Sequence, residues 1–202
     1  MIKAGIVLVD PDSKAVQRVI AFQINPDTLT RTLQAQGVGS DSGPHVDQLR
    51  LKGPPIETFK LEAQLDSNNG LPNPDGIAPD LSALEGIVYP TTAQLADADR
   101  DSRRGTLEII PMESPLALFV WSKSRVVPVR ITEFSVTEEM FDSELNPTSA
   151  KVSLTLRVLS VDDVTYSSSA GSIYLAYHQQ KERLAQSAAG GTLAALGISG
   201  VP

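Results

Sequence analysis

The chain has 202 residues, of which 24 are acidic and 17 basic, and its formal net charge is -7 at pH 7. This balance argues against a nucleic-acid partner, because binding to phosphates needs a clustered basic face. No cysteine occurs, which excludes disulfides, thiolate metal ligands and cysteine nucleophiles.

The first part of the chain is expected to form three strands. Ala4–Val9 and Val16–Gln23 flank the turn residues Asp10–Ser13, which predicts a hairpin. Asn25-Pro26-Asp27 predicts a second turn, after which Leu29–Gln36 resumes the alternation of a strand. The N-terminal apolar run ends too early for a signal peptide, and no run reaches the roughly 18 residues of a membrane span. We therefore expect assembly in the cytoplasm and no insertion into a membrane.

A long polar segment separates this region from the next strand. Gly37–Leu49 is rich in glycine and serine, and loops of that length are usually functional or ordered by a partner. Glu57–Leu65 then alternates clearly, which predicts a strand. Its inward side chains are expected to be Phe59, Leu61, Ala63 and Leu65.

The middle of the chain changes character. Ser67–Asp80 is rich in turn-forming residues, a composition that disfavours helices and strands. Leu81–Ala98 shows helical spacing, which Pro90 divides into two pieces. Thr106–Ile110 and Leu116–Trp121 are short apolar segments that predict strands.

Pro128–Leu159 carries the strongest signal in the chain. Two alternating segments, Val129–Val136 and Lys151–Leu159, flank an acidic connector that ends in the turn Asn146-Pro147. A period of two over this length predicts long, half-buried antiparallel strands joined by a protruding loop. Strict alternation in the first segment places two sets of side chains on opposite faces: Val129, Ile131 and Glu133 on one, and Arg130, Thr132, Phe134 and Val136 on the other.

A helix is predicted after Ser167–Ser172, from about Ile173 to Ser187. One side of this helix is expected to carry Ile173, Tyr177, Gln180 and Leu184, with Tyr174, Lys181 and Arg183 elsewhere. Such a weakly amphipathic helix is expected to dock on its own domain or on a neighbouring subunit. The glycine-rich tail beyond Ala188 would pack only against something outside the domain.

The residues give no catalytic or metal-binding pattern. Glu138, Glu139, Asp142 and Glu144 lie in one connector, whereas a glycosidase needs carboxylates across a cleft and a calcium loop needs a glycine at its turn. We interpret them as a solvated or partner-facing acidic loop. The two histidines have no serine or aspartate at motif spacing, and no phosphate-binding glycine pattern occurs. We therefore expect no enzymatic activity, no cofactor and no metal.

Four segments together resemble a known family. They are FQINPDTLTR (Phe22–Arg31), ETFKLEAQLD, the stretch from PLALFVWSK to SLTLRVL, and the helix containing YLAYHQQKE. Over about residues 3–185 they resemble the N-terminal domain of contractile injection system tube-type baseplate proteins, relatives of phage tail tube and tube-initiator proteins. Many members carry a LysM-like module after this domain, which the present sequence is expected to lack, so peptidoglycan binding is not implied.

The resemblance implies an α+β, mainly β fold: an antiparallel, phage-tail-tube-like β-barrel or sandwich with a short mid-chain helical insertion and a C-terminal helix. Residues 1–166 would form the tube-like domain, with the insertion at about 67–105, and residues 167–202 the helix and a flexible tail. The implied assembly is a hexameric ring between the trimeric spike and the inner tube, in contact with other baseplate or sheath subunits. Candidate subunit-interface residues are Glu138, Glu139, Phe141, Asp142, Asn146, Pro147 and Tyr177.

Other functions stay open from the residues alone. A tube terminator or cap adaptor would share the ring geometry, and only its position in the particle would differ. A carbohydrate-binding β-sandwich would need exposed aromatic side chains on loops, but only 5% of the residues are aromatic. A hydrolase with an acidic active site would lose its activity on mutation of Glu138 and Glu139.

Overall fold

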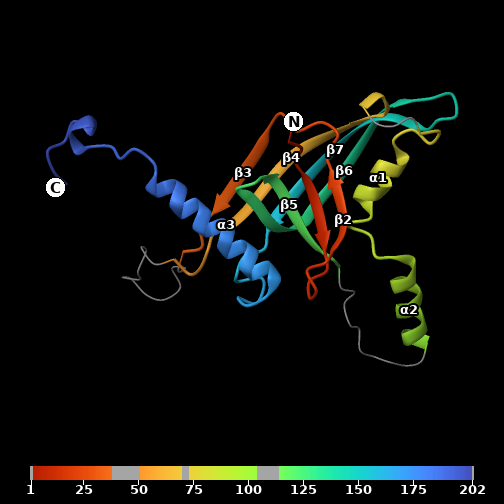
Figure 1. The fold of residues 1–202 in the computed structure, drawn as a ribbon, viewed down its shortest axis with the longest axis horizontal. Coiled ribbons are helices and arrows are strands. Elements are labelled where there is room, and N and C mark those ends of the chain that lie inside the picture. Colours follow the sequence, from red (N-terminus) through yellow and green to blue (C-terminus); the bar gives the residue numbers. More distant parts are fainter. Residues whose placement is uncertain (1, 38–50, 70–72, 104–113, 202) are drawn as a thin grey trace.

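The computed structural model describes residues 2–37, 51–69, 73–103 and 114–201 (Figure 1). Within these residues the chain forms a seven-stranded antiparallel sheet and three α-helices, which confirms the mainly-β, α+β class. The strands are β1 (Gly5–Val9), β2 (Val16–Ala21), β3 (Leu29–Gln34), β4 (Ile56–Asp66), β5 (Leu116–Ser122), β6 (Arg125–Phe141) and β7 (Pro147–Val158). The helices are α1 (Ala78–Glu85), α2 (Thr92–Arg103) and α3 (Ser169–Gln186), with 3-10 turns at η2 (Ser67–Asn69) and η3 (Leu193–Leu196).

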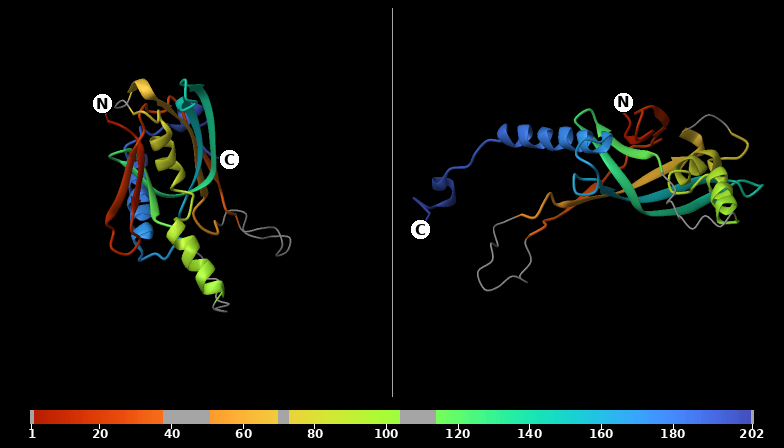
Figure 2. Two further views of the ribbon diagram at one scale, coloured as in Figure 1. Left: turned by 90° about the vertical axis from the view of Figure 1, so that its right-hand side faces the viewer. Right: turned by 90° about the horizontal axis from the view of Figure 1, so that it is seen from below.

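The sheet is curled around a main apolar core (Figure 2), and Val9, Leu116 and Ala170 form a second, smaller cluster. Its strand order is β2-β1-β5-β6-β7-β4-β3, so β5 and β4 are separated by two strands. The rings of Phe59 on β4 and Phe119 on β5 nevertheless lie 5.5 Å apart between centroids. No ladder joins β2 to β3 among the described residues, and the sheet therefore ends in two edges. Closure into a tube-like barrel stays a prediction.

A bulge at Thr132 changes the face that each β6 side chain occupies. Ile131 pairs with Leu156 and Glu133 with Thr155, so Thr132 is one extra residue on β6. The Thr132 hydroxyl donates to the Thr155 carbonyl oxygen at 3.1 Å. Inserting one residue inverts the alternation. Phe134 and Val136 therefore pack against the same core as Val129 and Ile131, and the predicted split between opposite faces is wrong.

The acidic connector is part of the hairpin and not a loop. β6 continues to Phe141 and β7 begins at Pro147, so the turn consists of residues 142–146. The two strands stay paired beyond their apolar segments, because the backbone hydrogen bonds between strands do not require apolar side chains. The sequence pattern therefore placed both strand ends too far from the turn.

Helix α3 begins at Ser169, earlier than predicted. The Ser168 side chain caps it by accepting a hydrogen bond from the Gly171 nitrogen at 3.1 Å. A Cβ at Gly171 would lie 2.5 Å from the Thr165 carbonyl oxygen, so only glycine allows this close approach. The buried face carries Tyr174 and Tyr177, whereas Leu184 is exposed. The predicted helix face was therefore wrong for Tyr174 and Leu184.

The mid-chain helical region is divided at Pro90, as predicted. α1 buries Leu81 and Leu84 in the main core, while α2 has no buried residue. The predicted strand Thr106–Ile110 and all but the first residue of the predicted loop Gly37–Leu49 lie outside the described residues. In Figure 1 and in the right-hand view of Figure 2 the segment after α3 extends away from the body of the protein.

Candidate functional site

The two edge strands are the first candidate contact surface. β2 is exposed along most of its length, with Val19 at 64% and Val16 at 61% exposure, and Leu33 on β3 is 49% exposed. No described strand pairs with the outer side of either. An uncovered edge presents unpaired N–H and C=O groups that can accept another strand.

The β6–β7 turn is built around Asp142. One carboxylate oxygen of Asp142 accepts hydrogen bonds from the backbone nitrogens of Glu144 (2.8 Å) and Asn146 (2.9 Å). The other accepts one from the Asn146 side-chain nitrogen at 3.0 Å. The Asn146 hydrogen bonds hold the pKa of Asp142 below its ordinary value. Asp142, a predicted interface residue, therefore shapes the turn.

Asn146 and Pro147 attach this hairpin to the segment before α1. The Asn146 side chain donates to the Pro74 carbonyl oxygen at 3.3 Å, and the Ile77 nitrogen donates to the Pro147 carbonyl oxygen at 2.9 Å. Gly76, with a φ of +61°, makes this contact possible, because a Cβ there would lie 2.2 Å from the Pro147 oxygen. Both predicted interface residues are thus engaged within their own chain.

The remaining predicted interface residues at this turn, Glu138, Glu139 and Phe141, are exposed. Glu138, Met140, Phe141, Glu144 and Leu145 form what we call the tip surface, and Leu145 is 78% exposed. Neither Glu138 nor Glu144 has an ion-pair partner among the described residues. Glu139 is paired with Lys151 at 2.6 Å. Large apolar side chains beside free carboxylates are features of a surface that contacts another protein.

Tyr177, the last predicted interface residue, belongs to a buried polar cluster that anchors α3. Glu57 on β4 is only 3% exposed, and its carboxylate accepts hydrogen bonds from the Tyr177 hydroxyl (2.7 Å) and the Lys181 ammonium (2.9 Å). Arg31 Nε lies 3.8 Å from the same carboxylate. Burial, followed by the adjacent Glu57, raises the pKa of Tyr177 to about 12. Tyr177 therefore holds α3 in place.

Sequence reasoning missed Glu57, although a signal was present. Glu57 has the same phase along β4 as Phe59 and Leu61, which were expected to point inward. A carboxylate in a buried phase requires a partner. The partners lie on β3 and α3, and no local pattern identifies them.

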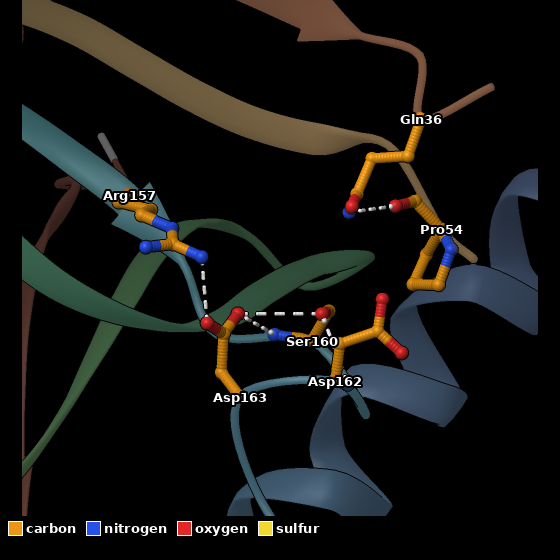
Figure 3. A network of polar contacts seen from close by, with 6 residues as sticks. All are labelled: Gln36, Pro54, Arg157, Ser160, Asp162 and Asp163. Atoms are coloured by element: carbon orange, nitrogen blue, oxygen red, sulfur yellow. Dashed lines mark hydrogen bonds and ion pairs between the residues drawn. The ribbon is translucent and has the colours of Figure 1, made fainter. Parts of the chain in front are cut away.

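A second polar network fixes the turn after β7 (Figure 3). Arg157 donates to Asp163 at 2.6 Å, and Asp163 also accepts from the Ser160 nitrogen at 3.1 Å. The Gly53 backbone approaches Asp162 so closely that a Cβ would lie 2.5 Å from its carboxylate oxygen. This turn leads into α3, so the network helps to position the helix.

The described residues show no gathering of three or more His, Asp or Glu side chains that could hold a metal ion. His178 stacks on the ring of Tyr174, and its Nε2 atom lies 3.6 Å from Oε1 of Glu182. His45 lies outside the described residues. Among the described helices, none is both long enough and apolar enough to cross a bilayer. No protein-family model matches the sequence, and a search of curated proteins finds no significant match.

Proposed function

We propose that this chain is a structural subunit of a phage-tail-like contractile injection particle. In this proposal it forms a ring, expected to be a hexamer, that adapts the spike to the inner tube and initiates tube assembly. The observation that carries the proposal is the curled antiparallel sheet with an uncovered edge at each end, β2 and β3. The resemblance of four sequence segments to baseplate tube domains supports it.

Two different edges on one subunit allow head-to-tail association. If β2 of one copy pairs with β3 of the next, the contact is heterologous, and it closes into a ring when the rotation per subunit permits. Ring closure would cover every uncovered edge, which removes the aggregation hazard that such edges create. This arrangement explains why exposed apolar side chains such as Val19 and Leu33 lie on the edges.

The outer face of the sheet suits a wet channel. Along β4 and β7 the side chains that point away from the core are polar: Lys60, Glu62, Gln64, Lys151, Ser153, Thr155 and Arg157. Such a face would line the lumen of the ring, while the apolar face stays packed beneath α1 and α3. The expected partners are the spike, the inner tube and the surrounding baseplate or sheath subunits, assembled in the cytoplasm.

The test is affinity purification of a tagged chain from its native host, followed by negative-stain imaging and mass spectrometry. We expect tail-like particles, or a ring with its spike, to be recovered. Recovery with the distal end of the tube would favour the terminator or cap adaptor. A monomer without tube, sheath or spike proteins would overturn the proposal and favour the carbohydrate-binding module.

A further inference from the structure

A cleft with a volume of 490 Å³ lies between α3 and the β5–β6 turn. Its lining includes the cations Arg31, Arg125 and Lys181 and the apolar side chains of Trp121 and Leu184. We call it the α3 cleft. The volume falls within the roughly 300–1,000 Å³ range of pockets that bind small organic groups.

The α3 cleft carries an excess of positive charge. Glu57 lies between Lys181 and Arg31, at 2.9 Å and 3.8 Å, and is the anion that faces these two cations. Arg125 forms no ion pair with any residue that the structure describes. One carboxylate therefore faces three cations, and a further anion would be attracted to Arg125.

The tip surface has complementary properties. From Thr137 to Ala150 the sequence has four acidic side chains and no basic one. Glu138 and Glu144 have no ionic partner in the described residues, and Phe141 and Leu145 are 50% and 78% exposed. The tip surface thus offers apolar side chains flanked by free carboxylates, and the α3 cleft offers an aromatic wall flanked by cations.

The two surfaces lie on opposite sides of the molecule. Figure 1 shows the β6–β7 turn at the right-hand end of the long axis, while α3 and the β5–β6 turn lie towards the left, and the right-hand view of Figure 2 shows the same arrangement. A rigid subunit therefore cannot bring its own tip surface to its own α3 cleft. A second copy of the chain can.

We propose that the tip surface of one copy docks in the α3 cleft of another. Phe141 and Leu145 would pack against Trp121 and Leu184, and Glu144 would face Arg125. An apolar centre supplies affinity in such contacts, while the charged rim fixes orientation. This inference rests on the proposed function: pairing of β2 with β3 closes the ring, and the tip-to-cleft contact joins copies along the direction of the hairpin.

Cysteine cross-linking tests the contact, because the chain has no cysteine of its own. Ser143→Cys places a thiol at the tip, and Ser124→Cys places one at the α3 cleft. Since these positions lie on opposite sides of one copy, a disulfide between them joins two copies. The double variant is expected to give a ladder of covalent oligomers under oxidising conditions. Ser143→Cys with Ser167→Cys, an exposed position before α3, is the matched control.

Charge reversal makes the test specific. In the double-cysteine protein, Arg125→Glu is expected to lower the yield of the ladder about tenfold, because like charges then face each other. Adding Glu144→Lys is expected to restore it. Arg183→Glu, on the exposed side of α3, should leave the yield unchanged. A structural defect caused by Arg125→Glu would not be repaired by a substitution at the other side of the molecule.

The outcomes separate this inference from the proposed function. A ladder from the tip-to-cleft pair, with rescue by the reversed charges, supports the contact. Rings without such a ladder, or an equal ladder from the control pair, overturn the contact and leave the ring proposal standing. A protein that stays monomeric and gives no ladder at high concentration overturns both.

Discussion

The Tyr177 hydroxyl donates a hydrogen bond of 2.7 Å to the Glu57 carboxylate, joining α3 to β4 across 120 positions of the chain. Lys181, one turn further along α3, donates to the second carboxylate oxygen and also lies 4.4 Å from the centre of the Tyr177 ring. A single buried carboxylate thus holds two side chains of the helix. The position of α3, and with it one wall of the α3 cleft, depends on Glu57.

Tyr177→Phe removes one of these hydrogen bonds without creating a large cavity. We expect the free energy of unfolding to fall by about 1–3 kcal/mol, because a buried acceptor loses a partner. Urea denaturation measures the change. Tyr166→Phe is the matched control, since Tyr166 is 67% exposed. Equal denaturation midpoints for the two variants would contradict the anchoring role of Tyr177.

The raised pKa of Tyr177 predicts a loss of stability at alkaline pH. Its pKa in the folded protein is about 12, compared with 10.0 ordinarily, because burial and then Glu57 disfavour the phenolate. A raised pKa means that the neutral side chain contributes stability below pH 10, and that this contribution is lost as the pH rises through about 12. Tyr177→Phe should therefore lose less stability than the wild type over this interval.

The absorbance of phenolate during a pH titration gives an independent readout. Of the four tyrosines, Tyr177 should ionise late in the wild-type protein, and Tyr177→Phe should remove the contribution of one tyrosine from the late part of the titration. If the variant instead loses a transition near pH 10, the environment inferred for Tyr177 is wrong. Tyr174, whose pKa is also raised by burial, should still ionise late in the variant.

Gly76→Ala should detach the β6–β7 hairpin from the segment before α1. Gly76 has a φ of +61°, and a Cβ there would lie 2.2 Å from the Pro147 carbonyl oxygen. The left-handed conformation alone costs a non-glycine residue about 1–2 kcal/mol, and the clash adds to it. We expect a fall in unfolding free energy of at least about 1 kcal/mol by urea denaturation. Gly190→Ala has open space around it and should change little.

Deleting Thr132 tests the bulge in β6. Without the extra residue, strict alternation would turn Phe134 and Val136 away from the core. We expect a loss of about 2–5 kcal/mol in unfolding free energy, since two large apolar side chains would lose their packing. Thr132→Ser keeps the residue count and the hydroxyl, and should cost much less. A deletion variant as stable as the wild type would show that β6 can shift its register freely.

Val19→Lys tests the role of the β2 edge in assembly. A lysine on an edge strand discourages pairing with another strand. We expect the variant to remain folded by circular dichroism but to sediment as a monomer where the wild type forms rings. Leu95→Lys, on the exposed helix α2, serves as control and should assemble normally. Assembly of both variants would place the contact elsewhere.

Elements with a local pattern could be predicted from the amino-acid sequence. The alternating apolar residues of β4 identified its buried face, because a strand presents every second side chain to the core. Pro90 divided the mid-chain helical region for an equally local reason: proline lacks the N–H that a helix needs.

Features that depend on distant partners could be seen only in the folded chain. The Thr132 bulge depends on the register with β7, and the continuation of β6 through Glu138 and Glu139 depends on a paired strand opposite. The buried face of α3 depends on two contacts with distant or preceding residues. Tyr177 contacts Glu57, and Gly171 packs against the Thr165 carbonyl. These are relationships between atoms far apart in the chain. A periodic pattern within one segment holds no information about them, because register and packing are properties of pairs of segments.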